Sequence, residues 1–242
     1  MISKEERREN LTFVAVTDIG SNHRVLCMPN QDAVGFKCVD GDFVIAVSDG
    51  VGSCKEAETG SRFVVEAVTK LFLDLKASAL HNDNHKMAEA VIANWKTLIG
   101  NKSIDEYCAT VKAVIKLGNI AKVISLGDGI AAITSNGISL VAPVAEASFT
   151  NETKCMSSFV LPEDIWIGDF NLDTYVPYTI FCCTDGVANG LVSGKELELV
   201  KEIENNTSSD VLKEELENLV KEIGDYSFDD KTVGVVKYER KN

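Results

Sequence analysis

Two kinds of hydrophobic spacing alternate along the chain and divide it into blocks of strands and blocks of helices. Short apolar or alternating runs at residues 11–16, 34–39 and 43–47 predict three strands. From residue 56 to residue 98, apolar side chains recur every three or four positions, which predicts two amphipathic helices. Their apolar faces comprise Ala57, Gly60, Val64, Val68 and Leu71 in the first helix and Met87, Val91, Trp95 and Leu98 in the second.

The second half of the chain repeats this order of strands and then helices. Turns that contain glycine separate short β-rich runs, which predicts an antiparallel meander. These runs cover residues 107–116, 121–126, 130–134 and 138–141. Residues 143–178 are expected to form a loop with one short strand or hairpin, followed by a strand over 179–184. Two more helices follow, with apolar positions at Leu197, Val200, Ile203, Leu212, Leu216, Leu219 and Ile223, before a last strand over 232–238.

Paired helices between blocks of strands predict an α+β protein with antiparallel sheets and helices outside them. No change of composition marks a linker, so the chain is expected to form one domain over residues 1–242. Residues 1–10 are highly charged, which predicts a solvated leader rather than a signal peptide. Residues 21–24 are expected to form a polar loop, and residues 208–210 to cap the last helix.

Charge and cysteine content narrow the class of protein. The formal net charge of −13 argues against nucleic acid or an anionic membrane surface as a partner. No apolar run reaches the roughly 20 residues that a membrane-spanning helix needs. The seven cysteines show no CxxC pairing or regular spacing, which is typical of free thiols in the reducing cytoplasm.

Candidate chemistry lies at the ends of the predicted strands. The strand over 43–47 leads into Asp49-Gly50, and the strand over 179–184 leads into Asp185-Gly186. A single Asp-Gly pair is most simply a turn. Five aspartates share this position at a strand edge: Asp32, Asp49, Asp128, Asp185 and Asp229. Gathered carboxylates repel one another unless cations neutralise them, and oxygen ligands without a matching His and Cys set favour Mg²⁺ or Mn²⁺.

The ordered set of motifs resembles the PPM family, the metal-dependent type 2C protein phosphatases, and looks most like a compact bacterial branch. The resemblance extends from about residue 12 to residue 238. The matching segments are residues 30–32 for the first acidic motif, 47–52 for the hallmark Asp-Gly motif and 57–61 for the helix start after it, with 126–128 for the Gly-Asp motif, 184–186 for the late Asp-Gly motif and 229–232 for the closing motif.

The resemblance implies a four-layer α/β/β/α sandwich with metal ions in a cleft at one edge. By the family pattern, Asp49 would bridge two ions, Asp32 and the Gly50 carbonyl would serve one, and Asp185 and Asp229 the other. Asp128 would help to hold a weaker third ion. The implied reaction is direct attack on phosphorus by a hydroxide held between two cations. The catalytic set would then be Asp32, Asp49, Asp185 and Asp229.

The chain departs from the family pattern at two positions. Many members carry a phosphate-binding arginine five residues before the first motif aspartate, where this chain has Cys27. The arginine that often follows the Gly-Asp motif is replaced by Gly129. The nearest candidate phosphate-binding residues are His23 and Arg24, and His23 could also protonate the leaving oxygen near neutral pH. The alternative is that both are solvated loop residues.

The resulting hypothesis is that the protein is a cytoplasmic, metal-dependent protein serine/threonine phosphatase that acts in signalling. It would act on phosphorylated proteins, in opposition to a serine/threonine kinase, with Mn²⁺ or Mg²⁺ as two core ions and a weaker third. An alternative is a catalytically weak PPM-like domain that binds phosphoproteins; the five aspartates argue against it and the missing arginine argues for it. A di-metal phosphodiesterase acting on nucleotides fits the chemistry, but this acidic chain lacks a basic or base-stacking surface for it.

Overall fold

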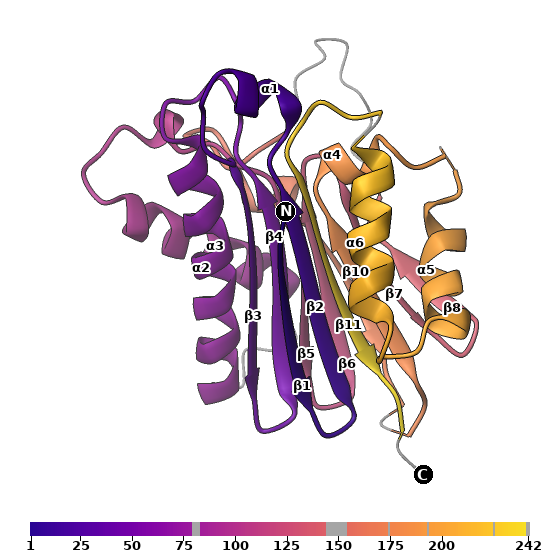
Figure 1. Ribbon diagram of the computed structural model, residues 1–242. Helices are drawn as coiled ribbons and strands as arrows, with labels where there is room; N and C mark the ends of the chain where they lie inside the picture. The colour runs from indigo at the N-terminus through magenta and orange to yellow at the C-terminus, as the bar shows by residue number, and fades with distance from the viewer. Residues whose placement is uncertain (79–82, 144–153, 174, 193, 225, 241–242) are drawn as a thin grey trace.

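The computed structural model describes residues 1–78, 83–143, 154–173, 175–192, 194–224 and 226–240. Its strands form two antiparallel sheets that lie face to face, and helices cover the outer face of each sheet (Figure 1). The expected α+β class and the four-layer α/β/β/α order are confirmed.

The first sheet contains six strands in the order β1-β2-β11-β10-β7-β8. Their bounds are Ile2–Arg8 for β1, Leu11–Asp18 for β2, Ile130–Ser135 for β7, Ile138–Val141 for β8, Tyr178–Cys183 for β10 and Lys231–Tyr238 for β11. The second sheet contains five strands in the order β3-β4-β5-β6-β9. Their bounds are Asp32–Val39 for β3, Asp42–Asp49 for β4, Val111–Leu117 for β5, Ile120–Leu126 for β6 and Trp166–Asn171 for β9.

Two pairs of helices form the outer layers. The pair α2 and α3 packs on the second sheet, and the pair α5 and α6 packs on the first (Figure 1). Short helices α1 and α4 lie at the strand ends. The bounds are Ser21–Val25 for α1, Ala57–Ala77 for α2, Asn84–Ile99 for α3, Asp185–Ala188 for α4, Glu196–Asn206 for α5 and Leu212–Ile223 for α6, with 3-10 turns at Ile104–Glu106 and Pro162–Asp164.

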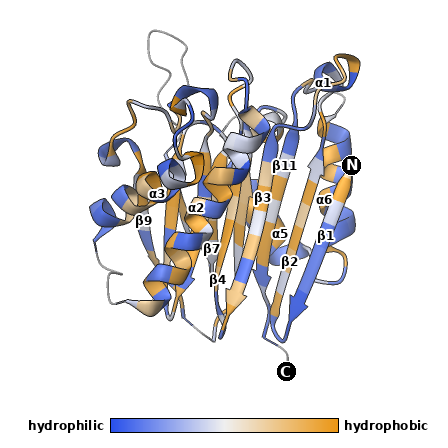
Figure 2. Cartoon of the chain, turned by 90° about the vertical axis from the view of Figure 1, so that its left-hand side faces the viewer, coloured by the Kyte–Doolittle hydropathy of each residue, from blue (hydrophilic) through white to orange (hydrophobic). Residues whose placement is uncertain are grey.

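The alternation of side chains along each strand explains the layers. In β4, Val44 and Ala46 contact the buried faces of α2 and α3, whereas Ile45 and Val47 point into the core between the sheets. Successive residues of a strand point to opposite faces, so one wholly apolar strand serves two cores. Figure 2 shows this apolar character along the strands beneath α2 and α3.

The expected leader is wrong, because residues 2–8 form β1 and pair with β2 along their whole length. This strand lies at the edge of the sheet, where most of its side chains are exposed. Its charged residues pair within the strand, Arg7 with Glu5 and Arg8 with Glu6. In Figure 2, β1 is coloured mostly blue, which marks it as a hydrophilic strand at the edge of its sheet. Charged side chains on an edge strand discourage pairing with other chains, and the same charges conceal the strand in the sequence.

The expected meander is also wrong at one turn. Strands β5 and β6 form a hairpin in the second sheet, and β7 and β8 form a hairpin in the first. The chain therefore crosses from one sheet to the other at residues 127–129. A tight glycine turn is compatible with either connection, and only the packing of the two sheets decides between them.

Smaller differences concern the connections. The expected loop at residues 21–24 is helix α1. Helix α6 has no side-chain cap; the Ser208 carbonyl accepts a hydrogen bond from the Leu212 amide instead (3.1 Å). Within the stretch expected to be irregular, β9 is the one short strand among the described residues, and 144–153 lie outside them. In the described parts of the chain, no helix has the length and apolar character needed to cross a bilayer.

Candidate metal centre

The aspartates singled out from the sequence lie at one end of the sandwich. Asp32 begins β3 and Asp49 ends β4, and the two are direct partners across the strands. Asp185 follows β10 as the first residue of α4, and Asp229 precedes β11 in the first sheet. Asp128 lies in the crossing between the sheets. Both sheets therefore contribute carboxylates to the same edge.

Backbone contacts fix the position of Asp49. Its amide donates to the Thr110 hydroxyl (3.0 Å), and its carbonyl accepts from the Thr110 amide (2.8 Å). The next residue, Gly50, donates to the Gln31 carbonyl (3.1 Å). A Cβ at Gly50 would lie 2.3 Å from the Ala57 carbonyl oxygen, so only glycine fits between β4 and the start of α2.

The turn that carries Asp128 needs both of its glycines. Gly127 and Gly129 have φ angles of 87° and 88°, which side chains rarely adopt. Beneath the turn, the Lys112 ammonium donates to the Gly127 carbonyl (2.8 Å) and to the Ser125 hydroxyl (2.7 Å). Burial lowers the pKa of Lys112 to about 8, and the charge of Asp128 opposes this effect. Sequence reasoning missed Lys112, although a lysine at a core-facing position of an apolar strand is an available signal.

Three of these carboxylates meet closely. Within the part of the chain that the structure describes, oxygens of Asp49, Asp128 and Asp185 all lie within 4.8 Å of one another. Asp32 is adjacent through its pairing with Asp49, and the charge of Asp229 acts on both Asp49 and Asp185. The structure thus brings together the five aspartates that the sequence marks.

The electrostatics of this group are unfavourable without cations. Burial, followed by the charges of Asp32 and Asp185, raises the pKa of Asp49 far above the usual carboxyl range. Burial also raises the pKa of Asp32, against a hydrogen bond from the Thr184 hydroxyl to its Oδ2 (2.9 Å). Burial together with the charges of Asp128 and Asp229 raises the pKa of Asp185 to about 6.

One buried oxygen of the group has no partner. Among the described residues, Asp32 Oδ1 is one of the few buried side-chain oxygens without a hydrogen bond. A buried carboxylate oxygen that lacks a donor is costly unless a cation or water satisfies it. The donor set is all oxygen and densely anionic, so these residues fit a hard divalent cation such as Mg²⁺ or Mn²⁺.

The two adjacent acids before β11 have different surroundings. Asp229 is exposed, and its Oδ1 accepts the amide of Asp230 (2.9 Å). Asp230 is buried and accepts from the amides of Gly20 and Gln31, both at 2.6 Å. Asp230 therefore ties the start of α1 and the approach to β3 onto β11. Sequence reasoning did not assign Asp230 a role of its own, although the acidic pair was the available signal.

The two candidate phosphate-binding residues lie on α1, and both have partners in the protein. His23 Nδ1 lies 2.8 Å from Asp230 Oδ2. Arg24 donates to Asp18 Oδ1 (2.6 Å) and to the Ile19 carbonyl (3.0 Å), while about half of its side chain stays exposed. Cys27, where many family members have arginine, is exposed with a φ of 54° at the end of this segment.

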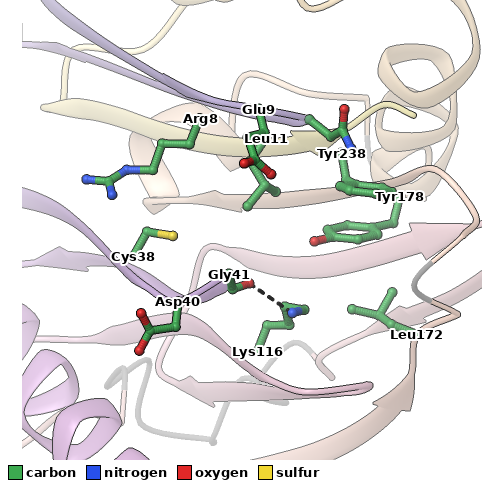
Figure 3. Close-up of a pocket in the computed structure, with 11 residues that line it drawn as sticks. Arg8, Glu9, Leu11, Cys38, Asp40, Gly41, Lys116, Leu172, Tyr178 and Tyr238 are labelled. Carbon is green, nitrogen blue, oxygen red and sulfur yellow. Dashed lines mark hydrogen bonds between the residues drawn. The ribbon is translucent and has the colours of Figure 1, made fainter. Parts of the chain in front are cut away.

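A pocket of about 650 Å³ lies at the other end of the sandwich, between the β1–β2 and β3–β4 turns (Figure 3). Tyr178 and Tyr238 stack in it with ring centroids 5.0 Å apart, and the Lys116 ammonium donates to the Gly41 carbonyl (2.9 Å). None of the five aspartates lines this pocket. We assign the metal chemistry to the aspartate end because, among the residues that the structure describes, three carboxylates that could hold a metal ion converge there.

Comparisons with known proteins identify the family and the fold. A family described as Protein phosphatase 2C matches residues 19–221. A sequence comparison with curated proteins finds no match.

Several solved structures share the fold. The structure of RsbX in complex with magnesium has a TM-score of 0.67 at 15% identity, covering 98% of this chain and 100% of that one. The S. agalactiae serine/threonine phosphatase gives 0.68 at 17% identity, covering 95% and 100%. The catalytic domain of the serine/threonine protein phosphatase PstP, in complex with two manganese ions, gives 0.66 at 16% identity, covering 95% and 99%.

At such identities the structural matches establish the fold, and the family match extends over most of the sequence. Two antiparallel sheets, paired outer helices and an aspartate cluster at one edge accompany that match. The chain therefore belongs to the protein phosphatase 2C family, the PPM phosphatases.

Proposed function

We propose that this protein is a metal-dependent protein serine/threonine phosphatase that hydrolyses phosphoserine and phosphothreonine. The observation that carries the proposal is the group of Asp49, Asp128 and Asp185, whose oxygens lie within 4.8 Å of one another at the edge where the two sheets meet. Such crowded carboxylates serve no structural purpose that outweighs their repulsion, whereas they suit a pair of divalent cations.

The proposed ligands follow the family pattern. Asp49 would serve both core ions, Asp32 and the Gly50 carbonyl the first, and Asp185 and Asp229 the second. Asp128 would serve a weaker outer ion. Mg²⁺ or Mn²⁺ bound there would lower the pKa of coordinated water, so that a nucleophile is present at neutral pH. The unpartnered Asp32 Oδ1 and the raised pKa values of the group support this assignment.

Other residues of the chain would position the reacting groups. The Thr110 and Thr184 contacts hold Asp49 and Asp32 in place before any ion binds. Asp230 engages Nδ1 of His23, so in the doubly protonated ring Nε2 would be the nitrogen that donates a proton to the leaving serine or threonine oxygen. Arg24 would bind the phosphoryl group with the exposed part of its guanidinium.

The remaining parts of the proposal concern the setting. Phosphorylated proteins would be the substrates, a serine/threonine kinase would oppose the reaction, and the protein would act in signalling in a bacterial cytoplasm. We further propose that residues 1–242 act as one phosphatase domain. The magnesium in RsbX and the two manganese ions in PstP support either ion as the cofactor.

A second candidate function is binding of phosphoproteins with weak or no turnover. One observation favours it: Cys27 replaces the usual arginine, and the nearby Arg24 is already bound to Asp18. This candidate shares the fold and the metal centre, so only turnover distinguishes the two.

The experiment compares three substrates, each with Mn²⁺ and with a chelator: p-nitrophenyl phosphate, a phosphothreonine peptide and a phosphate bis-ester. The proposal predicts metal-dependent release of phosphate from both monoesters and little turnover of the bis-ester. Asp49→Asn should abolish this release, whereas Asp74→Asn, at an exposed position of α2, should not. Peptide binding without turnover would favour the second candidate, and faster turnover of the bis-ester would favour a phosphodiesterase.

A further inference from the structure

Three free cysteines gather beside the metal centre, although they are far apart in the sequence. The thiols of Cys54 and Cys108 both donate to the carbonyl of Asp105, at 3.1 and 3.5 Å. The Cys155 thiol is a direct neighbour of the Cys108 thiol, and the hydrogen bond between them raises the pKa of Cys108 and lowers the pKa of Cys155. Cys108 therefore lies between two other thiols.

Backbone pairing brings these cysteines next to the strand end that carries Asp49. Ala109 bridges Gly50 on one side and Met156 on the other, both in the antiparallel sense. The Val51 amide donates to the Cys108 carbonyl (2.9 Å), and the Met156 amide donates to the Ala109 carbonyl (2.8 Å). In this register Cys108 and Cys155 lie diagonally across the bridge and on the same face.

We propose that Cys108 and Cys155 form an oxidation site, in which a peroxide converts the two thiols into a disulfide. Cys155 is half-buried and can meet a small oxidant, whereas Cys108 is buried behind it. This pair thus has the arrangement of a redox-sensing cysteine with its resolving partner. Cys182 and Cys183 are adjacent as well, but both are fully buried in β10, where burial raises the pKa of both thiols and keeps them from an oxidant.

The reaction balances with hydrogen peroxide as the oxidant. The Cys155 sulfur attacks one peroxide oxygen, the O–O bond breaks, and the products are a sulfenic acid on Cys155 and one water molecule. The Cys108 sulfur then attacks the Cys155 sulfur, the S–O bond breaks, and a second water molecule leaves with the Cys108 proton. Two thiols lose two electrons, and the peroxide gains them. The hydrogen bond with Cys108 lowers the pKa of Cys155, which supports its role as the first nucleophile.

The disulfide has a structural consequence for the metal centre. Diagonal neighbours across an antiparallel bridge lie farther apart than a disulfide prefers, so closing the bond shifts the backbone of residues 108–109 or 155–156. The residue after this segment is Thr110, which binds Asp49 through both its amide and its hydroxyl. A shift there moves a proposed metal ligand, and loss of such support typically lowers metal affinity about 10- to 100-fold.

The first test maps the disulfide and does not involve activity. The full chain is treated with hydrogen peroxide, free thiols are blocked, and the protein is digested without reductant for mass spectrometry. We expect a peptide pair joined through Cys108 and Cys155 that dithiothreitol separates. Cys155→Ser should abolish it, and the control Cys38→Ser should leave it intact. Absence of this pair, or a Cys54–Cys108 bond in its place, would overturn the proposal.

The second test measures Mn²⁺ affinity of reduced and oxidised protein by calorimetry. We expect about tenfold weaker binding after oxidation, recovered with dithiothreitol and absent in Cys155→Ser. Circular dichroism of each variant shows whether it folds, and Cys155→Ala provides a second variant if the serine does not. Equal affinity of reduced and oxidised protein would refute the link to the metal centre. Because neither readout is turnover, both tests hold even if the phosphatase proposal fails.

Discussion

Removing the carboxylate of Asp49 should stabilise the metal-free protein while abolishing its use of metal. The folded-state pKa of Asp49 lies above neutrality, whereas the ordinary carboxyl value is 3.8. At neutral pH, folding without cations must therefore protonate this group. Neutral pH lies about three units above the ordinary carboxyl pKa, and each unit costs about 1.4 kcal/mol. The Asp49 carboxylate therefore lowers the free energy of unfolding of the metal-free protein by about 4 kcal/mol. Asp49 is only partly buried, and solvent screening reduces this to about 2 kcal/mol.

The difference in free energy of unfolding between Asp49→Asn and the wild type should grow as the pH rises from about 5 to about 7. A carboxyl with a raised folded-state pKa contributes most to stability below its unfolded pKa and loses that contribution as the pH rises towards the folded value. Asp49→Asn does not titrate, so its advantage over the wild type should be about 2 kcal/mol near pH 7 and below about 1 kcal/mol near pH 5.

Thermal unfolding in chelator measures this difference. A gain of about 2 kcal/mol corresponds to a rise in Tm of about 4–8 °C for a chain of this size. With saturating Mn²⁺ the order should reverse, because only the wild type keeps the bridging carboxylate. Asp74→Asn serves as the control. An Asp49→Asn protein no more stable than the wild type near pH 7 would show that these carboxylates are not crowded as described.

Three further predictions concern the neighbours of Asp49. Asp128→Ala should leave two tight Mn²⁺ equivalents in calorimetric titration while turnover slows, and loss of all tight binding would refute its placement at an outer ion. His23→Ala or Arg24→Ala should raise KM or lower kcat several-fold on a phosphopeptide while Mn²⁺ affinity stays unchanged. His85→Ala, at an exposed position, is the control. Wild-type kinetics in both the His23 and the Arg24 variant would mean that the metals alone bind the phosphate. Lys112→Met should weaken the outermost Mn²⁺ site about tenfold, because the Gly127 carbonyl loses its buried donor, whereas Lys116→Met on the same strand should not; an unchanged titration would contradict this role.

Local sequence patterns predicted the helices, the strands and the aspartate cluster because each depends on residues that are close together in the sequence. The apolar run in residues 43–47 predicts β4, and the Asp-Gly pair after it predicts the turn. Contacts over long distances in sequence could not be predicted in the same way. The sequence near His23 does not predict its contact with Asp230, 207 residues away, and the sequence near Cys108 does not predict its contact with Cys155. The crossing at residues 127–129 was missed because its turn has the composition of a hairpin.

The division of the aspartates between the sheets has a consequence for how the domain opens. Asp32 and Asp49 belong to strands of the second sheet, Asp185 and Asp229 flank strands of the first, and Asp128 sits in the crossing. Ions held by this group would join the two sheets at the aspartate end, whereas the end with the tyrosine-lined pocket is joined by side-chain packing and by the connection from β9 to β10. Metal-dependent protection of backbone amides from hydrogen exchange would then be graded along β4, strongest near Asp49 and weakest near Asp42.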